Sequence, residues 1–267
     1  MSNAPADHKA TVREEFTRQA EGYAAAAPIR DPERIARLVE AVNPSPDARV
    51  LEVASGPGYV AMAFAARCRE VVGFDLTAAP VGIAERTRRE RGLANVRFEV
   101  GDAEHLPFSG GEFDVVVCRF AVHHFENPAA VIAEMARVAR AGGSVAIEDL
   151  IASEHPARAD YHNRFERLRD SSHTRALPLS ELVRMLARAG LEIVRFYSDR
   201  IVNPVGVWLS NAQTPPDRAE QARKMIEDDL ARDLSGTRPF RREGVLYFTH
   251  RTAAVIGRKL GADRKIG

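Results

Sequence analysis

The first candidate functional residues lie in the stretch VLEVASGPGY, positions 50–59. Its apolar start predicts a buried strand, and Gly56 and Gly58 predict a tight turn from that strand into a helix. Because glycine carries no side chain, the backbone of such a turn can approach a bound ligand closely. The pattern therefore predicts a loop that holds a nucleotide-type cofactor.

The acidic residue ahead of this loop bears on which cofactor it holds. The spacing Gly56-x-Gly58-x-x-Ala61 also satisfies the dinucleotide pattern, which is weak evidence by itself. In a dinucleotide site the start of the helix faces a pyrophosphate, and a carboxylate four residues ahead of the first glycine has no task there. Glu52 occupies that position. It suits a ligand with a cationic ammonium and no phosphate.

Two further carboxylates follow later apolar runs. Asp75 ends VVGFD, where a carboxylate accepts hydrogen bonds from the two hydroxyls of a ribose in either class of site. Asp102, in GDAEHLPF, is an additional acid, and we expect it to meet the adenine edge. The alternative roles are a helix cap for Asp75 and an ordinary turn residue for Asp102.

A pair of histidines supplies the candidate catalytic groups. His123 and His124 follow the predicted fourth strand at its carboxyl end, where open α/β sheets bind ligands. One of them could face an acceptor pocket as a general base. A structural hydrogen bond is the other interpretation, and the sequence leaves both open. For His173 and Arg175, which could hold an acidic substrate, a solvated charged loop is favoured.

Short apolar strands alternate with amphipathic helices between positions 49 and 150, and these elements must position the candidate residues. Such alternation predicts a doubly wound α/β fold with a mostly parallel sheet and helices on both faces. VRFEV alternates apolar and charged residues and is predicted as an edge strand, whereas the continuously apolar FDVVVC is predicted as central. The predicted strands are Val50–Val53, Val71–Asp75, Val96–Val100, Phe113–Cys118 and Ser144–Leu150.

Capping signals delimit three helices. Asp31 followed by Pro32 predicts one helix start, and Asn127 followed by Pro128 predicts another, which Gly142 and Gly143 are expected to stop. A third helix is predicted over Ser180–Gly190. The residues expected to face the core are Ile35, Leu38, Val39 and Val42, then Val131, Met135 and Val138, and finally Leu182, Met185, Leu186 and Ala189.

Composition narrows the class of protein. A chain of 267 residues with a formal net charge of +1 can bury a full core and does not suit a general polyanion binder, so no nucleic-acid partner is expected. Cys68 and Cys118 lie in apolar surroundings without metal-ligand spacing and are expected to be reduced core thiols; no metal site is predicted. No apolar leader or membrane-spanning run occurs, which predicts a soluble, cytoplasmic protein.

The ordered motifs VLEVASGPG, VVGFDLT, GDAEHLPF, FDVVVCRFAVHHF and GGSVAIEDL resemble those of the class I S-adenosylmethionine-dependent methyltransferases. The resemblance covers about positions 16–201 and is strongest to the small-molecule branch that includes the quinone-pathway C-methyltransferases. The C-terminal half looks like an uncharacterised bacterial subgroup. The resemblance implies a Rossmann-like sheet of seven strands, S-adenosyl-L-methionine as the cofactor and a small-molecule methyl acceptor.

By the same resemblance, particular residues take particular parts of the cofactor. The loop from Gly56 to Gly58 would hold the methionine part, Glu52 would organise the loop and the ammonium, and Asp75 would bind the ribose. The remaining residues implied at the cofactor are Leu76 against the adenine, Asp102 on its amino group with Ala103 beside it, Arg119 through backbone contacts, Phe16 and Tyr23 on a closing helix, and also Ala54 and His124.

The match departs from the family pattern at three positions. Glu52, Ala54 and Ser55 stand where the usual motif has Asp, Gly and Cys. At Ala54 the added methyl group could narrow the methionine site, or the backbone could be relaxed there. The departure therefore bears on the geometry of the loop and on cofactor affinity.

The predicted organisation places a cap over a cofactor-binding core. The expected segments are N-terminal helices closing over the cofactor (1–45), the core (46–152), a cap insertion (153–178), a core helix and strand (179–202), a second cap insertion with Trp208 (203–243) and a final strand and tail (244–267). We expect in-line methyl transfer to a small molecule. The alternatives are a methyltransferase-fold binding protein without turnover and an NAD-dependent dehydrogenase. Sequence does not give the oligomeric state or the acceptor.

Overall fold

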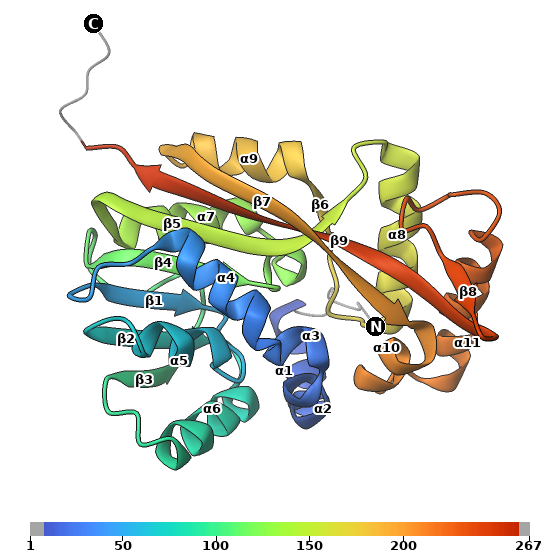
Figure 1. Ribbon diagram of the computed structural model, residues 1–267, viewed down its shortest axis with the longest axis horizontal. Helices are drawn as coiled ribbons and strands as arrows, with labels where there is room; N and C mark the ends of the chain where they lie inside the picture. Colours follow the sequence, from blue (N-terminus) through green and yellow to red (C-terminus); the bar gives the residue numbers. More distant parts are fainter. Residues whose placement is uncertain (1–7, 262–267) are drawn as a thin grey trace, which may run out of the picture.

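One sheet organises the chain, which is described over residues 8–261 by a computed structural model (Figure 1). Its strands run in the order β3-β2-β1-β4-β5-β9-β7, and β6 and β8 pair with β5 and β9. The strands are β1 (Arg49–Val53), β2 (Glu70–Asp75), β3 (Val96–Val100), β4 (Phe113–Arg119), β5 (Ala139–Ala152), β6 (Leu177–Pro178), β7 (Leu191–Pro204), β8 (Phe240–Arg242) and β9 (Val245–Lys259).

The directions of the strands confirm the predicted fold class. Strands β1 to β5 are parallel to one another, whereas β9 runs antiparallel to β5 and β7. Strand β3 lies at one edge and β4 is central, as the alternating and continuous apolar patterns predict. The carboxyl ends of β1, β2, β3 and β4 consequently meet at one edge of the sheet, where ligands bind in open α/β folds.

Helices cover both faces of the sheet. They are α1 (His8–Arg18), α2 (Ala20–Ala25), α3 (Ala27–Arg30), α4 (Pro32–Val42), α5 (Tyr59–Ala65), α6 (Ala78–Glu90), the 3-10 turn η1 (Val122–His124), α7 (Pro128–Val138), α8 (Pro156–Arg169), α9 (Leu179–Arg188), α10 (Val205–Asn211) and α11 (Pro216–Asp228). The carboxylate of Asp31 accepts the Glu33 and Arg34 N–H groups, and the side chain of Asn127 accepts that of Ala130. Both predicted helix starts are thereby confirmed.

Two predicted helix ends need correction. Helix α7 ends at Val138 rather than at Gly142, because Ala139 is already extended and pairs with Phe113 of β4. The two glycines therefore lie within β5. Helix α9 ends at Arg188, and Met185 and Ala189 are only partly buried against the core. Sheet pairing competes with the helix in the first case, and this competition is not visible in local sequence.

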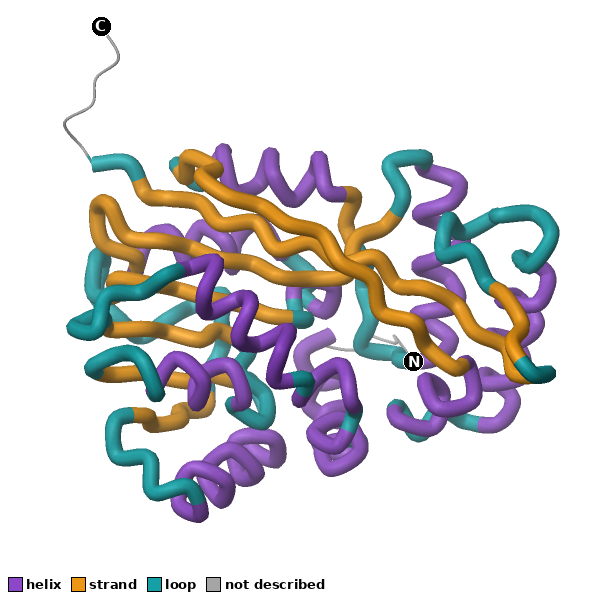
Figure 2. The backbone as a smooth tube through the Cα atoms, in the orientation of Figure 1, coloured by secondary structure: helices purple, strands orange, loops and turns teal. Residues whose placement is uncertain are grey.

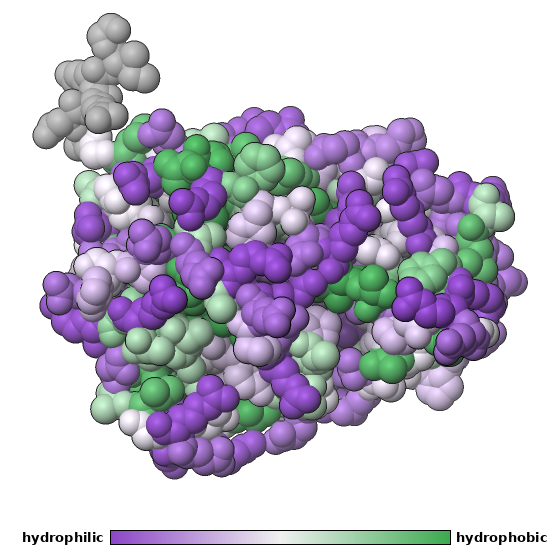
Figure 3. All heavy atoms as spheres, viewed as in Figure 1, coloured by the Kyte–Doolittle hydropathy of each residue, from purple (hydrophilic) through white to green (hydrophobic). Residues whose placement is uncertain are grey.

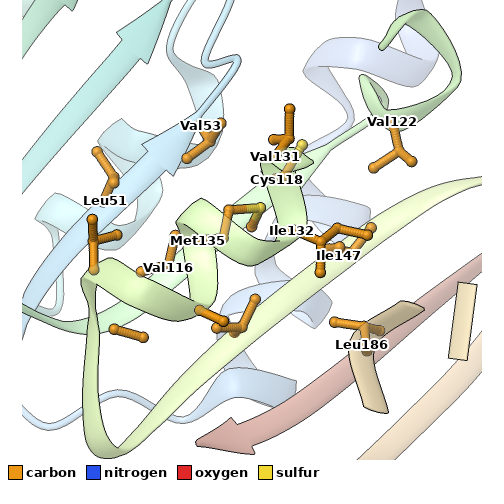
Figure 4. Packing of buried hydrophobic residues seen from close by; sticks show 14 of the residues in the cluster. Leu51, Val53, Val116, Cys118, Val122, Val131, Ile132, Met135, Ile147 and Leu186 are labelled. Atoms are coloured by element: carbon orange, nitrogen blue, oxygen red, sulfur yellow. The ribbon is translucent and has the colours of Figure 1, made fainter. Parts of the chain in front are cut away.

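Alternate residues of the strands pack in opposite layers of the core, because successive side chains of a strand point to opposite faces of the sheet. Leu51 and Val53 of β1 pack with Ile132 and Met135 of α7 (Figure 4). Val50 of the same strand packs in the other layer, with α4 and α5. The site-forming end of β1 is therefore held from both faces. Cys68 and Cys118 are buried and unpaired.

Strands β7 and β9 continue beyond the parallel strands and carry α8, α10 and α11 at one end of the molecule (Figures 1 and 2). These helices enclose a separate apolar cluster with Trp208 and Phe248, whose ring centroids lie 4.9 Å apart. We call this unit the cap. The segments predicted as two insertions contribute α8, α10 and α11 to it. The strands predicted within 179–202 and 244–267 are β7 and β9, but their extension into the cap was not predicted.

Helices α1 to α3 lie between the parallel strands and the cap, whereas α4 covers one face of the sheet (Figure 1). The Arg18 guanidinium donates to the carbonyl oxygens of Ala212 and Gln213, and Gln19 Nε2 donates to Asp170 Oδ2 at 3.1 Å. These bonds tie α1 to the cap. Residues 1–7 and 262–267, parts of the predicted first and last segments, lie outside the described residues.

The visible surface is mostly hydrophilic, with hydrophobic side chains in small groups (Figure 3). Within residues 8–261, none of the helices combines the length and the apolar character that a membrane span requires.

Candidate functional site

The loop after β1 adopts the left-handed conformations that its glycines favour. Gly56 has φ +51° and Gly58 has φ +76°. Ala54 has φ +55°, so the backbone keeps a glycine-like conformation although the residue is alanine. Of the two alternatives weighed for Ala54, a relaxed backbone is therefore wrong. Ser55 Oγ is buried beside this loop and has no hydrogen-bond partner within the described residues.

Asp75, at the end of β2, holds the loop. Its Oδ2 accepts the Gly56 N–H at 2.7 Å, and its Oδ1 accepts the Thr77 N–H at 2.8 Å. Burial raises the pKa of this carboxyl, and the backbone N–H groups oppose that shift. The carboxylate can still accept hydrogen bonds on its remaining lone pairs.

Glu52 links β1 to the first turn of α5. Its Oε2 accepts the Ala61 N–H at 2.7 Å. Burial raises the pKa of Glu52 to about 8. The side chain is therefore mainly protonated near neutral pH in the free protein, and a neighbouring cation would favour its ionised form.

A first cavity opens at the carboxyl ends of β1 to β4. It is lined by most of the residues predicted at the cofactor: Phe16, Tyr23, Ala54, Gly56, Asp75, Leu76, Asp102, Ala103 and His124. A side cavity continues from it and is lined by Glu52, Ser55 and Arg119, together with Tyr23, Ala54 and Gly56. The tertiary structure thus brings together residues that come from five separate parts of the chain.

Gly58 is placed differently from its predicted partners, because it lines none of these cavities. A Cβ at this position would lie 2.4 Å from the Phe98 ring. The residue must therefore be glycine for its close packing on β3 and for its positive φ. Sequence reasoning placed Gly58 at the ligand; the structure gives it a role in the turn.

Arg119 also has a structural task. Its guanidinium donates to the carbonyl oxygens of Pro28 and Ile29 at 2.9 and 3.0 Å, which fixes α3 to the end of β4. Its Nε lies 3.5 Å from Glu148 Oε2. The buried ion pair explains why an arginine side chain ends a central strand.

At the other wall of the first cavity, α1 reaches over β3. Lys9 Nζ lies 2.7 Å from Asp102 Oδ2 and 2.8 Å from Glu104 Oε2. Burial raises the pKa of Asp102, but the Lys9 ammonium outweighs burial and leaves the pKa lowered. Asp102 is therefore an ionised acceptor at neutral pH. Lys9 was not identified from sequence, because its partners lie more than ninety positions away.

Aromatic rings from the N-terminal helices close this side. Phe16 packs edge-on against Tyr23 at 5.4 Å and against His124 at 5.0 Å between ring centroids. The expectation of a single closing helix is wrong: Phe16 lies on α1 and Tyr23 on α2, and the contact between their rings brings both to the cavity.

A second cavity of about 350 Å³ lies between the sheet edge and the cap. Four residues, Phe16, Tyr23, Phe120 and His124, line both this cavity and the first. Residues unique to the second cavity include His123, Leu150, Glu166, Arg169, Asp170, Ile201, Val202, Asn203, Val207, Trp208 and His250. The two spaces are therefore neighbours across a shared aromatic wall.

His123 lines the second cavity and is oriented by a carboxylate. Its Nδ1 lies 2.5 Å from Asp149 Oδ1, and its backbone N–H donates to Asp149 Oδ2 at 3.2 Å. Burial lowers the pKa of His123, but the Asp149 carboxylate, together with the charges of Glu166 and Asp170, leaves it raised. Within the described chain Nε2 makes no hydrogen bond. A neutral His123 that donates from Nδ1 has a free lone pair on Nε2.

His124, although adjacent, differs from His123 in its hydrogen-bond partners and in its pKa. Its Nδ1 lies 3.1 Å from the Ser172 carbonyl oxygen and 3.0 Å from Ser172 Oγ. Burial, followed by the neighbouring His123 charge, lowers the pKa of His124 to about 4. The imidazole is therefore neutral and weakly basic at neutral pH.

Several residues that line the cavities were not identified from the sequence. Phe120 lines all three cavities and has φ +54°, a conformation that is costly for a bulky residue and is concentrated at functional sites. Its position between the predicted Arg119 and His123 was the only local signal. Glu166, Asn203 and His250 come from separate elements, and no sequence spacing connects them. His173 and Arg175 do not line the second cavity. Arg175 is exposed and pairs with Glu181, as a solvated loop predicts. For His173 that expectation is wrong, because its ring is buried and its Nε2 lies 2.7 Å from Asn163 Oδ1.

Comparisons with known proteins agree with this architecture. A family model of the methyltransferase domain matches residues 51–147. The uncharacterized methyltransferase YcgJ of Bacillus subtilis is 32% identical over 206 residues, which span 77% of this chain and 81% of that protein. A demethylmenaquinone methyltransferase of Deinococcus radiodurans is 36% identical over 116 residues, or 43% of this chain and 47% of that enzyme. The solved structure of a candidate methyltransferase from Bacillus halodurans has a TM-score of 0.81 at 30% identity, covering 86% of this chain and 100% of that one.

Proposed function

The chain belongs to the class I S-adenosylmethionine-dependent methyltransferases and is related to the quinone-pathway enzymes, and from this premise we propose that it methylates a small molecule held in the second cavity. One observation carries the proposal: Phe16, Tyr23, Phe120 and His124 form a wall common to the first and second cavities. A donor in the first cavity and an acceptor in the second would thus meet at this wall.

The residues of the first cavity and the side cavity suit the cofactor. Space for a ligand remains at Gly56, where a Cβ would meet only Tyr23, at 3.8 Å. Ser55 also lines the side cavity, but its Oγ is sealed from solvent and makes no hydrogen bond within residues 8–261, so we assign it no contact with the cofactor. We assign Glu52 to the ammonium, Asp75 to the ribose hydroxyls and Asp102 to the adenine amino group, with Leu76 and Ala103 against the ring.

The cofactor supplies an electrophilic methyl group on a sulfonium. The protein must then exclude water and align the acceptor, and the aromatic wall and the N-terminal helices perform both tasks. Where the acceptor carries a proton, His123 Nε2 removes it. The Asp149 carboxylate orients the ring and stabilises the imidazolium that forms. His124 is a poor base, because its pKa is lowered to about 4. We therefore assign His124 to the wall rather than to proton transfer.

The experiment that tests this function is a screen of small acceptors with methyl-labelled S-adenosylmethionine, read by label transfer. His123→Gln should remove turnover of an acceptor that loses a proton, while S-adenosylhomocysteine still binds. Unchanged turnover in the double variant His123→Ala with His124→Ala, with the fold intact, would refute the base. Label transfer to none of the small molecules but to a macromolecule would refute the acceptor class.

A further inference from the structure

A buried carboxylate in the second cavity has one oxygen that none of the described residues engages. Glu166 of α8 lines the cavity and is only 2% exposed. Its Oε1 lies 2.5 Å from His250 Nε2 and 3.3 Å from His162 Nε2. Across residues 8–261 its Oε2 makes no hydrogen bond, and this oxygen is not sealed off from solvent. This oxygen is thus accessible for a ligand.

Asn203 determines how the neighbouring histidine is protonated. Its Nδ2 donates to the Ile201 carbonyl oxygen at 3.1 Å and lies 3.1 Å from His250 Nδ1. An amide nitrogen can only donate, so His250 Nδ1 accepts and the proton of the neutral ring resides on Nε2. His250 therefore donates to Glu166, which stabilises the carboxylate as an anion.

The hydrogen bond from Asn203 to His250 disfavours a metal ion beside Glu166. His162, Glu166 and His250 offer ligand atoms within 4.8 Å of one another, a grouping that could hold a divalent cation. A ligating imidazole nitrogen must have no proton. Since Asn203 places the proton of His250 on Nε2, the atom that faces Glu166 is a donor and not a metal ligand.

Within residues 8–261 the basic groups beside Glu166 are His162 and His250, so when both rings are neutral its charge has no cationic partner, unlike that of the other carboxylate of the cavity wall. Asp170 lies 3.9 Å from Arg169 Nη1 and accepts hydrogen bonds from Gln19 and Ser172. The Arg169 Nε donates to the Trp208 carbonyl oxygen at 3.1 Å. Arg169 and Asp170 therefore offset each other, and a protonated His123 is offset by Asp149. When His162 and His250 are neutral, Glu166 thus remains as one net negative charge at the wall.

Apart from His123, His124 and Asn211, the rest of the wall is apolar and aromatic. The rings of Phe16, Phe120 and Trp208 and the side chains of Ile201 and Val207 surround the space. A ligand that fills it must bury an apolar body and satisfy one buried anion. A buried carboxylate is best satisfied by a cationic donor, because charge-assisted hydrogen bonds are about twice as strong as neutral ones.

We propose that Glu166 Oε2 anchors a protonated amine on the methyl acceptor, and that the acceptor is an amine with an apolar body. The inference rests on the proposed function, since it takes the second cavity as the acceptor site. Glu166 does not line the first cavity, so the anchored ammonium is distinct from the group that is methylated beside His123.

Matched ligands test the proposal on the protein saturated with S-adenosylhomocysteine. Trp208 is the only tryptophan of the chain, and it lines the second cavity, so its fluorescence reports binding there. The probes are 2-phenylethylammonium, the neutral 2-phenylethanol and the anionic phenylacetate. We expect the ammonium to bind about tenfold more tightly than the alcohol, and phenylacetate to bind least.

The variant Glu166→Gln keeps an oxygen for both histidines but removes the charge. It should abolish the preference for the ammonium and leave the affinity for 2-phenylethanol unchanged. Asp160→Asn, an exposed change on the same helix, is the control and should retain the preference. Retained affinity for S-adenosylhomocysteine shows that the variant folds. If Glu166→Gln does not fold, the order of affinities of the three probes for the unaltered protein still tests the proposal.

Three results would overturn the proposal: tightest binding of phenylacetate, no detectable binding of the ammonium, or an equal preference in Glu166→Gln. Stoichiometric zinc in the purified protein that is lost in His250→Ala would also overturn it, in favour of a metal site. A different result would contradict the proposed function rather than the role of Glu166. In that case the ammonium binds in a Glu166-dependent manner but does not compete with the turnover of any acceptor found in the label-transfer screen.

Discussion

His123 Nδ1 lies 2.5 Å from Asp149 Oδ1, so a turn after the central strand β4 is coupled to the neighbouring strand β5. The carboxylate fixes which ring nitrogen carries the proton and favours the protonated ring. The raised pKa of His123 contributes stability to the fold at pH values below the pKa of an unfolded histidine. That contribution is lost as the pH rises through the higher pKa of the folded state.

The variant Asp149→Asn should lower the pKa of His123, because burial then acts without the carboxylate. NMR titration of the His123 ring proton, assigned with His123→Gln, measures this directly and requires no acceptor. With an acceptor in hand, the acidic limb of the rate profile should move to lower pH while kcat falls about 10²- to 10⁴-fold. Asp160→Asn is the control. A His123 pKa that is equal in Asp149→Asn and the parent would contradict the pairing.

Cofactor binding at pH 7 should release a proton from Glu52. The pKa of this carboxyl in the free protein is about 8, and an ammonium placed beside it favours the ionised form. Affinity should therefore rise as the pH increases from 7 toward 8. Calorimetry with S-adenosylhomocysteine in buffers of different ionisation enthalpy measures the proton number.

The variant Glu52→Gln is the matched test of that linkage. It keeps an oxygen for the Ala61 N–H but cannot titrate. We expect its binding to release no proton from this site. Equal proton release by Glu52→Gln and the parent protein would assign the linkage to another group.

Asp75→Asn should weaken binding of S-adenosylmethionine and S-adenosylhomocysteine by about 10- to 100-fold. Hydrogen bonds to a charged group contribute roughly 1.5–3 kcal/mol, and the variant also loosens the Gly56 N–H contact. Calorimetric titration checks the loss, with NADH as the comparison ligand. Asp47→Asn, an exposed change ahead of β1, should bind like the parent. Tight binding of NADH alone would refute the cofactor assignments.

Ala54→Gly should stabilise the protein by up to about 1 kcal/mol, because alanine pays a steric cost at φ +55° that glycine does not. Chemical denaturation gives the free energy of unfolding. Ala63→Gly, inside α5, should instead lower it by about 1 kcal/mol. A lower stability of Ala54→Gly would show that the methyl group contributes packing that outweighs the backbone strain.

Much of the site could be predicted because its residues sit at the ends of predictable elements. Asp75 and Asp102 follow parallel strands, and parallel strands bring their carboxyl ends to one edge. Gly58 shows the limit of this reasoning. Its spacing matches a ligand loop, but the nearness of Phe98 to its backbone depends on how β3 packs, which the spacing does not encode.

The glycine loop, the order of edge and central strands, the helix starts and the carboxylates Asp75 and Asp102 of the first cavity could be predicted from the sequence alone. Those features depend on neighbouring residues, through side-chain periodicity and turn chemistry. Only the tertiary structure distinguished His123 from His124, because one meets Asp149 and the other Ser172. It alone joined Glu166 to His250, which are 84 positions apart. Contacts between distant segments depend on how the cap packs on the sheet, and local sequence does not specify that packing.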